Sequence, residues 1–324
     1  MFLRIAWSGS TCGFYPPERL PFKHLPHFRG CGRPAAGYIS GMARILIAGC
    51  GYVGSALGAQ LVRDGHEVWG IRRSRAGLPE GIRLLQGDLS DPALLSRLPD
   101  GIDTVFYTAS PDGFVDEAYR RTYVEDLQGL LHHLEETGAA RLLFTGSTAV
   151  YGTADGAWVD EESPAVPAGF PGRRILDGEA ILAASPLRTV SARLGGIYGP
   201  GRTRLLDQVR RGDARLLPPP TVWSNRIHRD DAAGLLRHLM DLDDPEPCYL
   251  GVDTRPADRN EIVSWLARRL GLPVPETDPD ASRGSGLRGN KRCSSRRLQQ
   301  SGYSFRYPTW REGYEAILEG YDSP

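Results

Sequence analysis

The fold of this chain is decided by the stretch Gly49-Cys50-Gly51-Tyr52-Val53-Gly54. An apolar run at residues 43–48 predicts a buried strand before it, residues 55–64 predict a helix after it, and residues 67–71 predict a second strand. In such a unit the spacing G-x-G-x-x-G is typical of a loop that holds a dinucleotide pyrophosphate at the helix N-terminus. We therefore expect a dinucleotide site made of Gly49, Gly51, Tyr52, Val53 and Gly54, in which Gly54 lets the helix pack on the strand.

Strands and helices continue to alternate beyond this stretch. Apolar runs predict strands at residues 83–86, 103–108, 141–147 and 188–194, and helical periodicity predicts helices at 114–136 and 175–184. The alternation predicts an α/β fold with a doubly wound parallel Rossmann sheet. In such sheets ligands bind at the carboxyl ends of the strands.

The alternation stops near residue 200, which divides the chain into three parts. Residues 1–41 are rich in proline and glycine without periodicity, so we expect a disordered extension upstream of a natural start at Met42. Residues 42–200 are the expected NAD(P)-binding Rossmann domain. Residues 201–324 predict a small α/β substrate-side lobe interleaved with the sheet, with helices near 205–211, 231–242, 260–270 and 310–318 and a strand at 248–252.

Composition disfavours several classes of protein. The 324 residues carry a formal net charge of +0, which argues against nucleic acid or an anionic membrane as a partner. The 5 cysteines are scattered without a C-x-x-C pair, so neither a metal site nor a disulfide framework is indicated. No run approaches the ~18 apolar residues of a membrane span. We expect a cytoplasmic protein that binds a small-molecule substrate, and formation of a homodimer stays open.

Two arginines follow the second strand, where an NAD-binding fold usually carries an acidic residue. The guanidinium groups of Arg72 and Arg73 suit a ribose 2′-phosphate by charge and by geometry, so we predict NADP rather than NAD, with solvated surface arginines as the alternative. Asp88 and Leu89 end the third strand and are predicted to contact the cofactor. Asp88 either accepts a hydrogen bond from the adenine amino group or caps the helix that follows.

Four further stretches resemble the extended short-chain dehydrogenase/reductase family, the NAD-dependent epimerase/dehydratase group. They are Phe-Thr-Gly-Ser-Thr-Ala-Val-Tyr-Gly at 144–152, Arg-Leu-Gly-Gly-Ile-Tyr-Gly-Pro-Gly at 193–201, Ile-His-Arg-Asp-Asp at 227–231 and Gly-Asn-Lys-Arg at 289–292. The resemblance runs from Met42 almost to the C-terminus. It implies an NAD(P)-dependent oxidoreductase or epimerase that acts on a sugar-nucleotide-like or other small carbonyl substrate.

The resemblance also implies catalytic residues, and most of them are missing. In that family a Ser and a Tyr-x-x-x-Lys pair carry the chemistry, and Ser147 matches the Ser. Pro171 and Ile175 fall at the Tyr and Lys positions, and Tyr123 falls at that of a helix Asn. Because no lysine occurs between residues 42 and 290, no Tyr-x-x-x-Lys pair can exist there. The chain is similar to atypical members of the family.

The residue that replaces the missing tyrosine stays open at this point. Tyr107, Tyr151 and Tyr198 lie at or beyond strand ends, and Tyr198 precedes Arg202 by the spacing of a tyrosine–cation pair. We take Tyr151 and Tyr198 as catalytic candidates beside Ser147. Two functions remain: an NAD(P)-dependent oxidoreductase or epimerase with an atypical active site, which we favour, and a non-catalytic protein that binds or senses NADP(H).

Overall fold

A computed structural model of the chain describes residues 41–139, 141–280 and 289–322. The extension expected at residues 1–41 lies outside these ranges except for its last residue. The central element is a seven-stranded parallel sheet with the order β11-β7-β5-β4-β1-β2-β3, which confirms the predicted fold class. Its strands are β1 (Arg44–Ala48), β2 (Glu67–Arg72), β3 (Ile82–Gln86), β4 (Thr104–Tyr107), β5 (Arg141–Ser147), β7 (Arg188–Leu194) and β11 (Cys248–Gly251).

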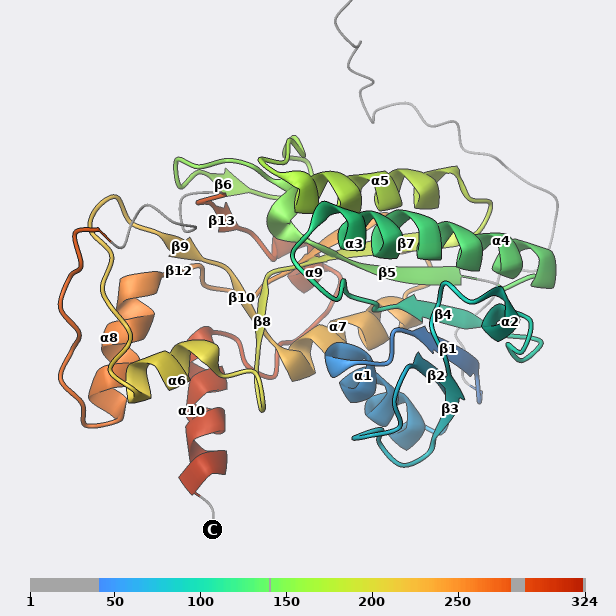
Figure 1. Ribbon diagram of the computed structural model, residues 1–324, viewed down its shortest axis with the longest axis horizontal. Helices are drawn as coiled ribbons and strands as arrows, with labels where there is room; N and C mark the ends of the chain where they lie inside the picture. The colour runs from blue at the N-terminus through green and yellow to red at the C-terminus, as the bar shows by residue number, and fades with distance from the viewer. Residues whose placement is uncertain (1–40, 140, 281–288, 323–324) are drawn as a thin grey trace, which may run out of the picture. The chain divides into compact units, whose positions relative to one another are not determined.

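Helices cover both faces of this sheet (Figure 1). Along β1, Ile45 and Ile47 belong to one buried cluster, and Leu46 and Ala48 belong to another. Because successive side chains of a strand point to opposite faces, a strand buried on both faces is apolar throughout. The first cluster includes α1 (Tyr52–Arg63) and α7 (Arg229–Asp241), and the second includes α4 (Leu127–Thr137) and α5 (Phe170–Ala184).

The helical stretch after β4 is not a uniform α-helix. The sequence predicts one helix at 114–136, whereas the structure has α3 (Asp116–Arg120), a π-helical segment η1 (Arg121–Asp126) and then α4. A π-helical segment inserts an extra residue per turn and is frequent at functional sites. This segment contributes Thr122, Tyr123 and Asp126 to the cleft described below.

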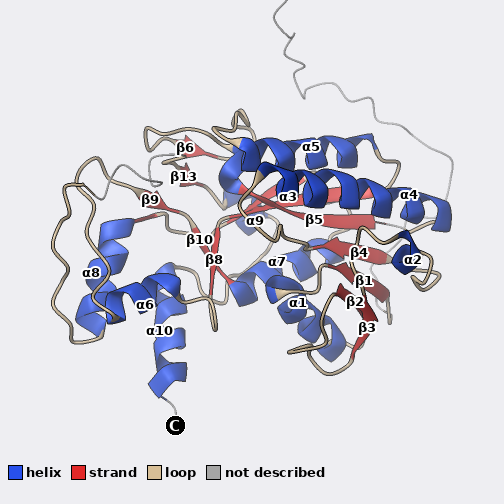
Figure 2. Ribbon diagram, viewed as in Figure 1, coloured by secondary structure: helices blue, strands red, loops and turns tan. Residues whose placement is uncertain are grey.

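The second half of the chain adds a group of helices beside the sheet (Figure 2). A separate buried cluster holds α6 (Arg204–Arg210), α8 (Arg259–Arg269) and α10 (Trp310–Asp322) together. β11 pairs with β7, so the lobe segment contributes an edge strand to the main sheet. The remaining helical elements are short: α2 (Pro92–Leu95), η2 (Thr148–Val150) and α9 (Arg296–Gln300). The remaining strands form three pairs: β8 (Gly196–Tyr198) with β10 (Arg226–His228), β9 (Trp223–Ser224) with β12 (Ala257–Asp258), and β6 (Trp158–Val159) with β13 (Arg292–Cys293).

Two absences hold for the described ranges. No helix in them is long and apolar enough to cross a membrane. No group of three or more His, Cys, Asp or Glu side chains in them is placed to hold a metal ion.

A buried acid after β11 makes stability depend on pH. Asp253 is 2% exposed; its Oδ1 accepts a hydrogen bond from the Arg255 N–H at 3.2 Å, whereas its Oδ2 has no partner among the described residues. Burial raises the pKa of Asp253 to about 8, although the Arg255 N–H and the Arg226 guanidinium oppose the shift. An unfolded Asp has a pKa of about 3.9, so between about pH 4 and pH 8 the folded chain holds a proton that the unfolded chain has lost.

We therefore expect the free energy of unfolding to fall as the pH rises from about 5 to about 8, and we expect Asp253→Asn to remove this part of the fall. The difference should be on the order of 1–3 kcal/mol. Urea denaturation of wild type and variant at both pH values measures it. If the free energy of unfolding fell by the same amount with pH in both proteins, Asp253 would not be the group that causes the fall.

Candidate cofactor and active site

A cleft of about 940 Å³ opens at the carboxyl ends of the parallel strands. Its walls come from segments at or just after these ends, including residues at 49–53, 71–74, 87–89, 108–112 and 145–147. One side is completed by α3 and η1, which contribute Tyr119, Arg121 and Tyr123, and by α5, which contributes Pro171 and Ile175. The cleft therefore lies where doubly wound sheets bind their ligands.

The glycine loop suits a pyrophosphate. Gly49 has a φ of +86°, Gly51 donates its N–H to the Gly49 carbonyl at 2.6 Å, and α1 begins at Tyr52 without a side-chain cap. A Cβ on Gly51 would meet only the Gly49 oxygen, at 3.8 Å, so the space in front of the loop is open. Uncapped N–H groups at a helix N-terminus favour an anion. Gly49, Gly51, Tyr52 and Val53 line the cleft, whereas Gly54 packs against Ile47 and Thr108 beneath it.

We expect Gly49→Ala to destabilise the fold by about 3 kcal/mol or more, because the new Cβ would clash with the Ala109 backbone and Gly49 has a positive φ. Gly65 has a φ of +88° with no atom within 4 Å of an added Cβ. Gly65→Ala therefore isolates the cost of the left-handed backbone, about 1–2 kcal/mol. Equal losses in the two variants, measured by urea denaturation, would show that the contact with Ala109 contributes nothing.

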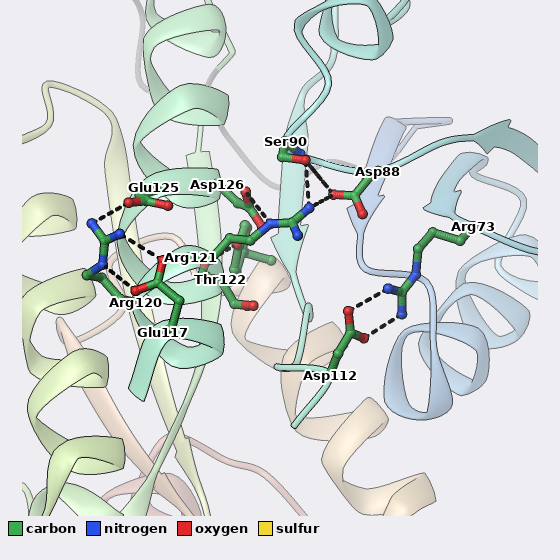
Figure 3. Close-up of polar contacts among 11 residues, drawn as sticks. Arg73, Asp88, Ser90, Asp112, Glu117, Arg120, Arg121, Thr122, Glu125 and Asp126 are labelled. Atoms are coloured by element: carbon green, nitrogen blue, oxygen red, sulfur yellow. Dashed lines mark hydrogen bonds and ion pairs between the residues drawn. The ribbon is translucent and has the colours of Figure 1, made fainter. Parts of the chain in front are cut away.

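Arg72 and Arg73 both line the cleft, but their surroundings differ. Arg72 is half-buried and makes no ion pair with any described residue. Arg73 is exposed and donates from Nη1 and Nη2 to the two carboxylate oxygens of Asp112, each at 2.6 Å (Figure 3). The cleft therefore holds two cations at the end of β2, one of which is already paired.

Asp88 and Leu89 also line the cleft. The Asp88 carboxylate accepts hydrogen bonds from the Ser90 N–H at 3.1 Å, from the Ser90 hydroxyl at 2.9 Å and from Arg121 Nη2 at 2.9 Å (Figure 3). Burial alone would raise the pKa of Asp88, but these hydrogen bonds and the Arg121 charge lower it. The alternative role as a helix cap is wrong, because Asp91 caps α2 by accepting from the Ala93 N–H.

A second carboxyl group faces the same end of the cleft. Asp126 is 8% exposed, and burial raises its pKa to about 6, while the Arg121 guanidinium, with Nε at 3.9 Å, opposes the shift. Arg121 therefore lies between two acids, Asp88 and Asp126 (Figure 3).

At the other end, the structure brings Ser147, Pro171 and Ile175 to one cleft. The Ser147 hydroxyl oxygen accepts a hydrogen bond from the Ala149 N–H at 3.2 Å, so its proton is free to donate. The two α5 positions matched to the family's Tyr and Lys carry apolar side chains. Lys291 is 5% exposed, donates to the Gly289 carbonyl at 3.2 Å and does not line the cleft. It therefore takes no part in the cleft that Ser147 lines.

The tyrosines chosen from the sequence lie elsewhere. Tyr151 is 1% exposed and its hydroxyl accepts from Arg193 Nη1 at 2.6 Å; Tyr198 is 3% exposed and donates to the Trp310 carbonyl at 3.4 Å. Neither lines the cleft. The cation over the Tyr198 ring is Arg226 rather than Arg202, which stacks on Tyr52 instead. The geometry argues against a catalytic role for both tyrosines, because a buried, bonded hydroxyl cannot reach a substrate in the cleft.

Two tyrosines that were not chosen as catalytic candidates from the sequence do line the cleft, Tyr119 and Tyr123. Tyr123 is 8% exposed, and its hydroxyl neither bonds to any described residue nor is sealed from solvent. Its ring packs on Phe144 of β5 at 5.9 Å and on Tyr119 at 5.7 Å. Burial raises the pKa of Tyr123 well above its usual value, so the hydroxyl is protonated at neutral pH. The signal in the sequence was the match of Tyr123 to the position of the family's helix Asn, with Tyr119 four residues earlier in the same helical stretch.

Comparison with known proteins places the chain in a family. The model of the NAD dependent epimerase/dehydratase family matches residues 45–241. A solved Methylobacillus flagellatus protein, described as an NAD-dependent epimerase/dehydratase, is 35% identical, with a TM-score of 0.73 over 87% of this chain and 99% of its own. MoeE5, solved in complex with UDP-glucuronic acid and NAD, is 25% identical, with a TM-score of 0.74 over 86% of this chain and 98% of its own.

A curated relative is similar to the same part of the chain. The 2-alkyl-3-oxoalkanoate reductase of Stenotrophomonas maltophilia is 27% identical over 261 residues, which is 72% of this chain and 77% of that protein. The family model covers more than half of the 324 residues and includes the glycine loop, the two arginines at the end of β2 and Ser147. The resemblance drawn from the motifs is thereby confirmed, and the chain belongs to the NAD-dependent epimerase/dehydratase family.

Proposed function

We propose that this protein is an NADP-dependent oxidoreductase or epimerase that acts on a sugar-nucleotide-like or small carbonyl substrate without a Tyr-x-x-x-Lys pair. The proposal rests on one observation: the glycine loop, the two arginines Arg72 and Arg73, and Ser147 all line the same cleft. MoeE5 binds a UDP-sugar and the Stenotrophomonas relative is named for reduction of an oxoalkanoate, so both substrate classes have a precedent among similar proteins. Cytoplasmic location and homodimer formation stay predictions.

The choice of NADP over NAD rests on charge at the end of β2. The 2′-phosphate adds about two negative charges to the ribose, and guanidinium groups bind such a group through charge-assisted hydrogen bonds. Arg72 lines the cleft without a carboxylate partner in the described part of the chain. We assign acceptance from the adenine amino group to Asp88, whose lowered pKa keeps it ionised at neutral pH. Its hydrogen bonds from Ser90 and Arg121 all go to Oδ1, which leaves Oδ2 to accept from the adenine.

The chemistry assigned to this chain's own residues is proton handling. When bound, NADPH supplies the hydride that reduces a carbonyl carbon. The Ser147 hydroxyl donates a hydrogen bond to the substrate oxygen and stabilises the charge that develops there. We assign proton donation to Tyr123, because this residue lines the cleft and its hydroxyl is protonated, not sealed from solvent and without a hydrogen bond to any described residue. The resulting tyrosinate regains a proton from water at the cleft mouth.

A binding protein without turnover is the second candidate. The observation that favours it is that Pro171 and Ile175 place apolar side chains in the cleft at the positions of the family's Tyr and Lys. Neither group can lower the pKa of a tyrosine or hold a ribose hydroxyl.

The test is NADPH oxidation across a panel of UDP-sugars and small carbonyl compounds. We expect turnover of at least one member, reduced about 100-fold or more by Ser147→Ala with the dissociation constant of NADPH unchanged. Tight NADPH binding with no turnover on any member, and no effect of Ser147→Ala, would refute the enzyme and favour the sensor.

A further inference from the structure

An ion pair crosses the cofactor end of the cleft. Arg73 directly follows β2, and Asp112 lies in the loop between β4 and α3 (Figure 3). In the sheet β1 lies between β2 and β4, so the pair joins the strands on either side of the glycine loop. Both residues line the cleft. A dinucleotide bound at the glycine loop would therefore have to lie against this pair.

The pair occupies the part of Arg73 that a phosphate would use. Both terminal nitrogens of the guanidinium donate to Asp112, Nη1 to Oδ2 and Nη2 to Oδ1, each at 2.6 Å. Bidentate recognition of a phosphate uses the same donor geometry, so carboxylate and phosphate compete for one edge of the group. Arg72, on the neighbouring position, makes no ion pair with a described residue. Asp112 thus neutralises one of the two cations predicted to recognise the 2′-phosphate.

We propose that Asp112 is a specificity-determining residue, which competes with the 2′-phosphate of NADP for Arg73 and so limits the preference for NADP over NAD. This inference rests on the proposed role of Arg73. NAD carries only an uncharged hydroxyl at this position, so its binding leaves the pair closed. The hydrogen bonds from Arg73 lower the pKa of Asp112, which keeps the carboxylate charged at neutral pH.

The pair is weak enough to be displaced. The side chains of Arg73 and Asp112 are 63% and 61% exposed, and exposed ion pairs shift an equilibrium by at most about fivefold. NADP can therefore still bind, with a penalty that NAD does not meet. Specificity of this kind comes from an unfavourable interaction with one ligand as much as from a favourable one with the other.

The experiment compares Asp112→Asn with the wild type, using adenosine 2′,5′-bisphosphate and 5′-AMP as probes that differ only in the 2′-phosphate. Titration calorimetry measures their dissociation constants, together with those of NADP and NAD. We expect the variant to bind the bisphosphate and NADP about fivefold more tightly, and to bind AMP and NAD within about twofold of the wild type. Asp213→Asn is the matched control, because Asp213 pairs with Arg211 at 2.8 Å, the two side chains are 59% and 62% exposed, and Asp213 does not line the cleft.

Asp112→Asn tests the competition for Arg73, and Arg73→Ala tests the role of Arg73 on which that competition rests. An unchanged preference in Asp112→Asn, equal tightening of both probes, or weaker NADP binding would overturn the role of Asp112. If Arg73→Ala leaves the preference for NADP intact, Arg73 does not recognise the 2′-phosphate, and the proposed role on which the inference rests is wrong. If Arg73→Ala weakens NADP selectively while Asp112→Asn changes nothing, only the competition is wrong.

Discussion

Replacing Arg72 and Arg73 together by alanine should weaken NADP binding on the order of 100-fold and NAD binding less than about threefold. Each charge-assisted hydrogen bond to a phosphate contributes roughly 1.5–3 kcal/mol, and the double variant removes both donors from the end of β2. NAD presents only a hydroxyl at the ribose 2′ position, so its binding free energy should change little. The dissociation constants of both cofactors, measured by titration calorimetry with the same protein preparation, give the two ratios.

A matched control is the double replacement Arg210→Ala with Arg211→Ala. These adjacent arginines lie at the end of α6 and do not line the cleft. The control removes the same net charge, so it accounts for the long-range electrostatic effect on an anionic ligand. Equal loss of NADP and NAD in the Arg72 and Arg73 variant would refute recognition of the 2′-phosphate.

Tyr123→Phe should lower kcat/KM about 100-fold or more for any substrate turned over with NADPH, and leave the dissociation constant of NADPH unchanged. Loss of a positioned general acid typically costs a factor of about 10² to 10⁴, and phenylalanine keeps the ring that packs on Phe144 and Tyr119. Steady-state kinetics of both proteins, with their thermal unfolding compared, measure the effect.

Tyr119→Phe is the matched control for this variant. Tyr119 lines the same cleft one helical turn earlier, and its hydroxyl also makes no bond to a described residue. We expect a change of less than about threefold. A large loss in Tyr119→Phe with none in Tyr123→Phe would move the proton donor to Tyr119, and a loss in neither would leave the assignment without support.

The sequence determined the central sheet with little ambiguity. Residues 45–48 are apolar without a break, because this part of β1 is buried on both faces of the sheet. The glycine spacing is equally informative, since a backbone with a φ of +86° at Gly49 accepts few other residues. The short strand pairs, such as β6 with β13, could not be predicted, because a strand of two residues is too short to show an alternation of apolar and polar side chains.

The absence of the family's Tyr-x-x-x-Lys pair follows from the sequence alone. Without a lysine between residues 42 and 290, the family's usual pair is excluded before any folding is considered. The tyrosine that we propose in its place, Tyr123, reaches the cleft only through long-range packing. Tyr151 and Tyr198 follow strand ends in the sequence, yet the fold buries both against Arg193 and Trp310.

The sequence by itself determined the fold class, the dinucleotide loop and the loss of the usual catalytic pair, because each depends on local pattern or on composition. Only the tertiary structure decided which side chains share the cleft, since Tyr123, Ser147 and Ile175 come from three separate elements. It also decided that Arg73 is paired with Asp112, while Arg72 forms no ion pair with any described residue. Asp112 lies 39 residues from Arg73 in the chain, and the order of β4, β1 and β2 in the sheet brings them into contact.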